Sequence, residues 1–190
     1  MPLGYLILAH LLGDFILQPS KLVKWKMSSR YGVIFHVAIH FILILLVFSP
    51  YLIDGQIWPV FTAFGLSFFH FLIDQSKINY DLKHDQKVKP FLLDQIFHFL
   101  TILIAYFLLK DFVQALPAGD FNEIYSQVRI SIFLSFTVLV SIVVEVFAYQ
   151  YQREKNGKAK LKINTDQMLT RVLVLTSVYI LFMVLSYLLR

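Results

Sequence analysis

The amino-acid sequence predicts an all-α fold, a polytopic membrane helix bundle that forms a single transmembrane domain over residues 1–190. The chain is 58% hydrophobic and only 15% charged, and its mean hydropathy of +0.68 is high for a water-soluble domain. Apolar runs of the length needed to cross a bilayer recur along the chain, and the basic residues between them gather in alternate loops. Together these observations predict about six transmembrane helices.

The apolar runs place these helices between polar connecting segments. We expect helices at residues 3–18, 33–53, 57–75, 91–109, 128–149 and 169–189. The first helix is short for a span, about 24 Å at 1.5 Å per residue, and it ends at the Gln18-Pro19 dipeptide. It carries one of the pairs of ionisable residues described below, so we count it as a helix of the bundle.

The loops alternate in charge. Three loops are rich in lysine or arginine: 19–32, 76–90 and 150–168. The two loops between them are poor in cations: 54–56 and 110–127. In the first basic loop the cations are Lys21, Lys24, Lys26 and Arg30. Because basic loops stay in the cytoplasm, this alternation predicts a multi-pass protein with both termini outside.

Four pairs of metal-ligand-type residues, each spaced by four positions, lie in the first four predicted helices. They are His10/Asp14, His36/His40, His70/Asp74 and Asp94/His98. A four-residue step places both side chains of a pair on one face of a helix, and ionisable groups in membrane helices usually face the bundle interior or an aqueous cavity. The predicted orientation puts all four pairs at a similar depth, just inside the cytoplasmic interface. We therefore predict one site built from all four helices.

The pairs also follow an internal repeat. The first helix reads HLLGDFILQPSK and the third reads HFLIDQSK, and corresponding pairs are 60 or 58 residues apart. This repeat favours a duplicated helical hairpin for the first four helices. We expect residues 1–110 to form a four-helix core around a metal site. Residues 111–190 would then supply two flanking helices, as a shield or as a contact between copies in a homo-oligomer.

The eight paired residues comprise five imidazoles and three carboxylates. Nitrogen and oxygen ligands without sulfur suit Zn²⁺, Mn²⁺ or Fe²⁺, and the absence of cysteine excludes thiolate ligands and disulfides. One catalytic zinc needs about three protein ligands and a water, so eight ligands predict two divalent metal ions, with zinc favoured. Two metals a few ångströms apart can catalyse the displacement of an ester or phosphoryl group.

Other polar residues near the pairs are candidates for supporting roles. Three glutamines lie beside the pairs or one turn beyond them and are available to orient ligands or substrate: Gln18, Gln75 and Gln95. Lys77 is a candidate for binding an anionic headgroup or a developing oxyanion. Glu145 is a candidate general base or ninth ligand.

Structural interpretations compete with each of these assignments. The His and Asp pairs are also suited to hydrogen bonding between helices. Lys77 is equally suited to anchoring its helix at the cytoplasmic surface, and Glu145 to pairing with Arg153 or with another helix. The sixth histidine, His84, lies among lysines and aspartates in a loop, where we expect it to be solvated.

The motif L-x-x-H-L-L-G-D-F-x-L-Q-P, followed by F-L-L-D-Q-x-x-H, resembles a family of small bacterial inner-membrane proteins known only as a domain of unknown function. The resemblance covers about residues 3–100 and rests mainly on the segments 10–14 and 91–98. It implies a location in the bacterial inner membrane but no activity. There is a looser similarity to predicted membrane-bound metal-dependent hydrolases, which also carry His and Asp at the cytoplasmic ends of helices.

These observations favour an integral-membrane metal-dependent hydrolase that acts on an ester or phosphoester of a lipid or other amphiphile. One alternative is a divalent-metal or proton-coupled transporter, whose site should lie nearer the bilayer midplane. Further alternatives are a membrane di-iron oxygenase and a structural or partner-binding membrane protein. We expect contact with membrane lipid but no nucleic-acid partner, because the cations behind the pI of about 9.3 lie in loops between apolar spans.

Overall fold

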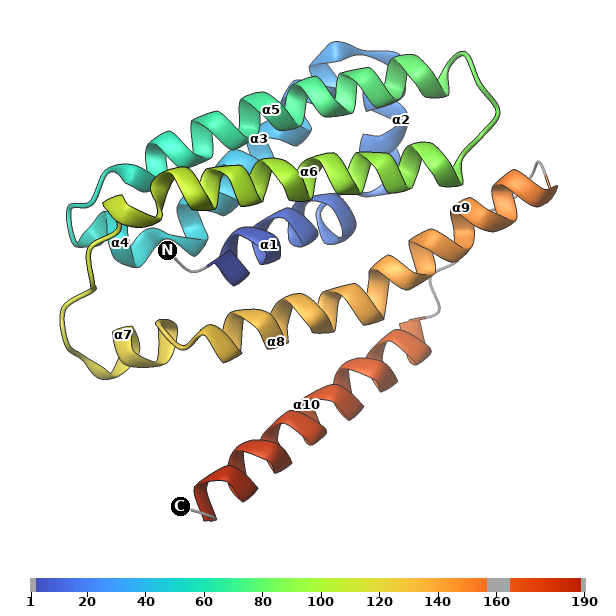
Figure 1. Cartoon of the computed structure of the whole chain (residues 1–190). Helices are drawn as coiled ribbons and strands as arrows, with labels where there is room; N and C mark the ends of the chain where they lie inside the picture. The colour runs from blue at the N-terminus through green and yellow to red at the C-terminus, as the bar shows by residue number, and fades with distance from the viewer. Residues whose placement is uncertain (1–2, 157–164, 189–190) are drawn as a thin grey trace.

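The structure, a computed structural model, describes residues 3–156 and 165–188, and every regular element in these two ranges is helical (Figure 1). The predicted all-α fold is confirmed. In chain order the elements are α1 (Leu3–Leu11), the π-helical turn η1 (Leu12–Ile16), α2 (Ser20–Ser28), α3 (Arg30–Val47), α4 (Ser49–Ile53), α5 (Trp58–Asp81), α6 (Val88–Leu109), the 3₁₀ turn η2 (Lys110–Phe112), α7 (Asp120–Tyr125), α8 (Val128–Val138), the π-helical turn η3 (Leu139–Val143), α9 (Val144–Asn156) and α10 (Thr165–Leu188).

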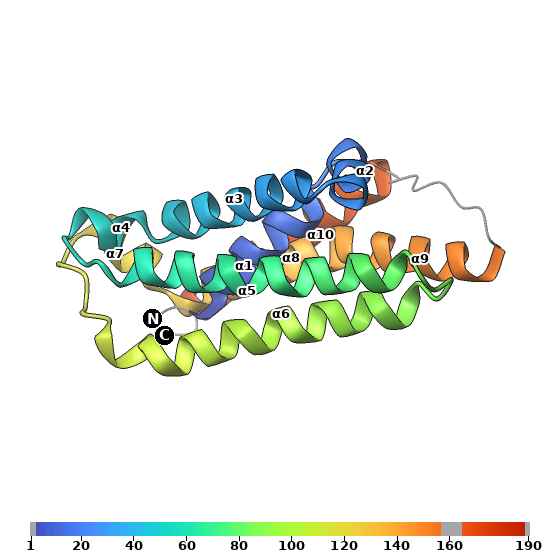
Figure 2. The same cartoon turned by 90° about the horizontal axis from the view of Figure 1, so that it is seen from above.

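Four helices form a bundle in which α1 packs on α3 and α6, while α5 packs on α3 and α6 from the other side. Neighbouring helices in this ring run in opposite directions (Figure 1). The α5–α6 loop and α2 lie at one end of the bundle, the α2 end, and α4 and α7 lie at the other, the α4 end (Figure 2). The α1–α3 and α5–α6 hairpins form opposite edges of the ring, the arrangement expected of a duplicated hairpin.

The last helices lie outside this ring. The continuous stretch α8–η3–α9 packs along α1 and α6, and α10 packs on α8 and η3. Close approach of α8 to α1 depends on Gly4, because a Cβ there would lie 2.8 Å from Ser131 Cβ. Ser135 Oγ also donates a hydrogen bond to the Gly4 carbonyl oxygen at 3.0 Å.

An aromatic cluster fills the α4 end of the bundle. The rings of Tyr5 and Tyr125 stack with their centroids 4.5 Å apart, and Trp58 packs against Tyr51 with centroids 5.1 Å apart. Burial raises the pKa of Tyr125, so its hydroxyl stays protonated and donates to the Val47 carbonyl oxygen at 2.6 Å. These contacts fix the α3–α4 and α7–α8 junctions at this end.

Three stretches within the described residues are long and apolar enough to cross a membrane: Arg30–Val47, Val88–Phe112 and Val128–Asn156. The stretches Leu3–Ile16 and Ser20–Ser28, bent by 88°, would count as a fourth if they form one broken span. Many large apolar side chains on the outer faces are exposed, among them Phe61, Phe64 and Phe107. The structure therefore contains several apolar spans, and the count of six stays a prediction.

Several predicted boundaries were wrong. The first basic loop, expected at 19–32, contains helix α2, which begins after Pro19 and buries Leu22 and Lys26 one turn apart on one face. The expected helix 33–53 is broken at Phe48, because Pro50 provides no N–H for the helix to continue through it.

The third and fourth helices extend further toward the α2 end than expected, to Asp81 and from Val88, and leave only a short connection between them. The apolar pattern of the sequence does not extend to these helix ends, because the additional turns of α5 and α6 are mostly polar and lie largely on the surface. The fifth helix likewise continues to Asn156. The sixth begins at Thr165 rather than 169, and its expected last residue, 189, lies outside the described residues.

Candidate metal centre

Four helices each carry a row of buried residues at four-residue intervals. Because neighbouring helices are antiparallel, these rows align into three layers across the bundle. The aliphatic layer contains Leu6, Ile44, Leu66 and Ile102. The histidine layer contains His10, His40, His70 and His98. The acidic layer, nearest the α2 end, contains Asp14, His36, Asp74 and Asp94. The last two layers together hold all eight predicted ligands, which we call the His/Asp cluster.

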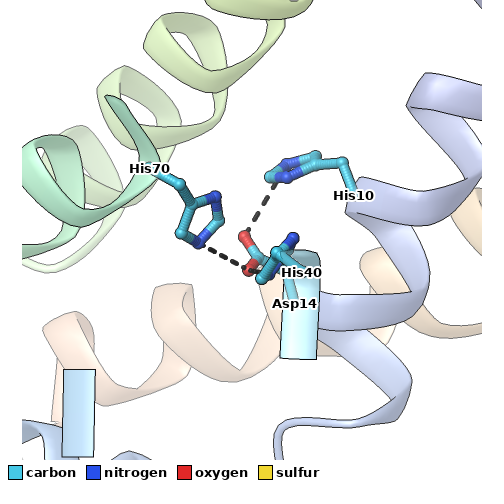
Figure 3. A group of neighbouring side chains, drawn as sticks. All are labelled: His10, Asp14, His40 and His70. Carbon is cyan, nitrogen blue, oxygen red and sulfur yellow. Dashed lines mark hydrogen bonds and ion pairs between the residues drawn. The ribbon is translucent and has the colours of Figure 1, made fainter. Parts of the chain in front are cut away.

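The four imidazoles of the histidine layer are in mutual contact. The ring centroids of His40 and His70 are 3.8 Å apart and those of His70 and His98 are 4.0 Å apart. His10 completes the layer, with its centroid 4.9 Å from that of His98 and 5.7 Å from that of His40. Three of these histidines and Asp14 turn their polar atoms toward a common point (Figure 3).

Asp14 lies at the centre of the cluster. Its Oδ1 is 3.0 Å from Nε2 of both His36 and His40 and 3.5 Å from Nε2 of His70. The Nε2 atom of His36 is in turn 3.2 Å from those of His40 and His70. Tetrahedral ligands of one zinc ion lie about 3.3 Å from each other, given Zn–N bonds of about 2.0–2.1 Å. The five distances just given among these four donor atoms, 3.0–3.5 Å, fit that spacing.

The second oxygen of Asp14 faces another set of ligands. Oδ2 lies 3.7 Å from His10 Nε2, and Asp14, Asp94 and His98 each offer a ligand atom within 4.8 Å of the others. Asp94 Oδ1 is 3.5 Å from His98 Nε2, and Asp74 Oδ1 is 3.7 Å from the same nitrogen. The Asp14 carboxylate therefore has potential ligand atoms near both of its oxygens. His10 also lies within ligand distance of Asp14, His40 and His70, so these four residues could hold one ion together.

Local backbone structure directs Asp14 into the cluster. The residue lies in the π-helical turn η1, whose wider turn rotates the side chains that follow it. The preceding Gly13 lies against the His40 ring, where a Cβ would approach His40 Nε2 to 2.5 Å. A residue with a side chain at this position would hold α1 and α3 further apart. The glycine therefore brings the carboxylate within reach of the histidines.

One cation of the first basic loop, Lys26, also lies at the site, where loop charge alone did not predict it. Lys26 is buried, and its Nζ lies 2.5 Å from Asp74 Oδ2 and 3.0 Å from Gln18 Oε1. Gln18 also donates to the backbone oxygen of Asp14 at 2.9 Å. The available signal was the four-residue step between Leu22 and Lys26 in the first basic loop, which predicts one face of a short helix.

The remaining candidates divide into those near the cluster and those apart from it. Gln95 Nε2 donates to Asp94 Oδ2 at 3.1 Å, and its Oε1 lies 3.4 Å from His10 Nε2. Lys77 Nζ is 3.7 Å from Asp94 Oδ2, and its side chain is 27% exposed. Gln75 instead donates to Asn79 Oδ1 at 3.2 Å, one turn further along α5.

Glu145 takes part in a contact between helices. Its Oε1 lies 2.8 Å from Arg171 Nη1 and links α9 to α10. Glu145 is therefore paired with another helix, which was one of its two expected structural roles, and its partner in the structure is Arg171 rather than Arg153. His84 is exposed, as expected, and stacks on Tyr80 with ring centroids 4.0 Å apart.

A small cavity lies between the histidine and aliphatic layers. It has a volume of about 20 Å³ and is lined by the eight residues of those layers together with Thr101. A space of this size holds about one water molecule. The polar contacts of Lys26 and Lys77 are on the opposite side of the cluster, at the acidic layer. The two sides of the cluster therefore differ in polarity.

The fold and this arrangement define a helical bundle with apolar spans and a buried His/Asp cluster of metal-ligand type. The chain belongs to the family described as protein of unknown function (DUF3307), whose model matches residues 3–125. The predicted resemblance to a domain of unknown function is thereby confirmed. No curated protein and no solved structure matches the chain. The matched region contains the whole His/Asp cluster and Lys26, whereas α8–α10 lie beyond it.

Proposed function

We propose that this chain is an integral-membrane, metal-dependent hydrolase with a dinuclear centre in the His/Asp cluster. The position of the Asp14 carboxylate, with one oxygen facing each of two donor groups, carries this proposal. Nitrogen and oxygen donors without sulfur suit zinc best, with Mn²⁺ or Fe²⁺ as alternatives. When bound, such a metal pair polarises an ester or phosphoryl group and supplies a hydroxide at neutral pH.

In this proposal the donors are divided between two ions. The first set contains Asp14 Oδ1 and Nε2 of His36, His40 and His70. The second contains Asp14 Oδ2, Asp94 and His98, whose ligand atoms lie within 4.8 Å of each other, and we add His10 because its Nε2 is 3.7 Å from Asp14 Oδ2. Asp74 is left to pair with Lys26. Gln95 orients Asp94 and His10 by hydrogen bonding to both. Lys77, partly exposed beside Asp94, is placed to bind negative charge on a substrate. Glu145 has no part in this proposal, because Arg171 holds its carboxylate.

The charge pattern supports a substrate that reaches the site from the cytoplasmic leaflet of a bacterial inner membrane. Three cations of the first basic loop stay exposed: Lys21, Lys24 and Arg30. Although Lys26 points inward, these three exposed cations still favour a cytoplasmic location for that loop. The acidic layer lies on the same side of the cluster as this loop. A lipid or other amphiphile with its headgroup at that surface is the substrate class we favour.

One observation supports a divalent-cation carrier as a second candidate. His70 is the thirteenth of the 24 residues of α5, and His98 is the eleventh of the 22 residues of α6. The histidine layer therefore lies at the middle of these helices, not near their ends as expected for a site just inside the cytoplasmic interface, because α5 and α6 extend further toward the α2 end than predicted. Transporter sites commonly lie near the bilayer midplane. Metal flux into proteoliposomes would identify a carrier, whereas a hydrolase should release product without net flux.

Elemental analysis of purified, tag-free protein tests the proposal. We expect two zinc ions per chain in the wild type, and loss of both in a His36→Ala, His98→Ala double variant, because it removes a ligand from each set. His84→Ala, outside the cluster, is the matched control and should keep both ions. Iron in place of zinc would favour the di-iron oxygenase. Wild-type protein without stoichiometric metal, even after reconstitution, would overturn the proposal.

A further inference from the structure

Helix α2 carries a buried cation into the acidic layer by a specific backbone contact. The chain bends by 88° between η1 and α2, and the backbone at Trp25 and Lys26 then rests directly on Gly32 of α3. A Cβ at Gly32 would lie 2.6 Å from the backbone nitrogen of Lys26. The absence of a side chain at Gly32 thus lets α2 approach closely enough for Lys26 to reach Asp74.

A buried ammonium group is costly unless it is paired. Lys26 contacts two acceptors, Asp74 Oδ2 at 2.5 Å and Gln18 Oε1 at 3.0 Å, although an ammonium group has three N–H donors. The Lys26 ammonium group therefore has the donor capacity to bind one more oxygen. A further anionic oxygen at the acidic layer would provide the third acceptor.

Lys77 supplies a second cation on the same layer. Its Nζ lies 3.7 Å from Asp94 Oδ2, just as Lys26 contacts Oδ2 of Asp74. The Oδ1 atoms of both aspartates face His98, at 3.5 and 3.7 Å, and Oδ2 of Asp74 is also 3.7 Å from Nε2 of His36 and of His70. The two lysines therefore lie on the side of these carboxylates that faces away from His98, and neither lines the cavity beside the histidine layer.

The net charge of the metal-loaded cluster favours a phosphoester over a carboxylic ester as the substrate of the proposed hydrolase. The cluster contains three carboxylates, and two divalent ions would more than balance them. With Lys26 and Lys77 the loaded centre carries a surplus of three positive charges. A carboxylic ester is neutral and leaves this surplus unmatched, whereas a phosphoryl group brings up to two negative charges and three acceptor oxygens.

We propose that Lys26 and Lys77 form an anion-binding subsite that selects a phosphoryl group, which makes the substrate a phosphoester rather than a carboxylic ester. This inference rests on the metal-dependent hydrolase proposed above. In the reaction a water oxygen bonds to phosphorus, the bond from phosphorus to the alcohol oxygen breaks, and that oxygen takes up a proton. The products are an alcohol and phosphate, or a phosphomonoester if the substrate is a diester.

Phosphate binding to the full chain in detergent, loaded with zinc, tests the subsite. Inorganic phosphate is titrated by calorimetry into the wild type, Lys26→Met, Lys26→Arg and Lys77→Met, and zinc content is measured on the same samples. Loss of a hydrogen bond to a charged group predicts binding weaker by about tenfold to a hundredfold for each methionine variant. Lys26→Arg keeps the charge and should stay within a few-fold of the wild type.

Lys24→Met is the matched control, because Lys24 is exposed on the same helix, and it should bind phosphate like the wild type. Methionine variants that keep two zinc ions and bind phosphate as tightly as the wild type would overturn the subsite. So would a zinc-loaded wild type that does not bind phosphate. A wild type that holds no zinc would instead overturn the hydrolase itself. Lys77→Met keeps the test decisive if Lys26→Met does not fold, since the Lys77 side chain is partly exposed.

Assays with two substrates distinguish a lipid headgroup from a free, water-soluble phosphomonoester as the source of the phosphoryl group. Phosphate release is measured from phosphatidic acid in nanodiscs and from a water-soluble phosphomonoester. Release from the lipid alone assigns a headgroup substrate, and release from the soluble compound alone assigns a free one. Either outcome supports the subsite when it depends on Lys26. Hydrolysis of a carboxylic-ester lipid with no release from either phosphoester would contradict it.

Discussion

The imidazole of His40 packs directly on Gly13, so that a Cβ at residue 13 would lie 2.5 Å from His40 Nε2. Real Cβ atoms essentially never make so close a contact, and both neighbouring elements are packed. Gly13→Ala should therefore displace η1 or His40 and separate Asp14 from its histidine partners. We expect at least one of the two metal ions to be lost, with a lower melting temperature in detergent.

Gly65→Ala is the matched control for this change. Gly65 lies inside α5 with no atom within 4 Å of an added Cβ, and alanine is favoured over glycine in a helix by about 0.5–1 kcal/mol. This variant should keep both metal ions and unfold at the same or a slightly higher temperature. Equal metal content in the two variants would show that the contact between Gly13 and His40 does not set the geometry of the centre.

The three aspartates should differ in their effect on metal stoichiometry. Asp14 faces both donor groups, so Asp14→Asn should remove both ions. Asp94 contacts His98 alone among the histidines, so Asp94→Asn should remove one. Metal-to-protein ratios measured after gel filtration distinguish the two variants. Retention of one ion by Asp14→Asn would exclude a bridging carboxylate.

Metal binding should stabilise the folded bundle. An ion that binds only the folded state adds about 4 kcal/mol of stability at a thousandfold excess over its dissociation constant. A chelator should therefore lower the melting temperature of the purified protein, and zinc should restore it. A His36→Ala, His98→Ala double variant should abolish this difference and His40→Ala should reduce it, whereas His84→Ala should keep it. A chelator-independent melting temperature in the wild type would indicate that the cluster joins helices by hydrogen bonds only.

Variants of the Glu145–Arg171 ion pair distinguish a structural role of Glu145 from a catalytic one. Arg171→Met should weaken the attachment of α10 by about 1 kcal/mol, since partly exposed pairs contribute little more. Protection of α10 from hydrogen exchange measures this loss, and metal content should not change. Glu145→Gln should behave in the same way. A Glu145→Gln variant with normal folding and metal but no hydrolysis would restore its predicted role as general base.

The charge of the first basic loop predicts a cytoplasmic side for that loop, and this orientation stays a prediction. The four cations of the loop do not have equivalent positions in the structure. One of them, Lys26, instead lies in the acidic layer. Composition of a loop does not reveal this difference, because Lys24 and Lys26 are two residues apart and have equal charge. Only the helical turn of α2 directs one toward the bundle and leaves the other exposed.

The sequence by itself determined the helical class and the set of eight residues that meet in the interior. Both depend on local regularities, since a four-residue step fixes a helix face and alternating loop charge aligns the depth of successive helices. The tertiary structure decided how these residues divide. The position of Asp14 between two donor groups, the entry of Lys26 and the close contacts at Gly13 and Gly32 depend on how helices cross and bend. Those distances arise from packing between segments remote in sequence, which no local pattern encodes.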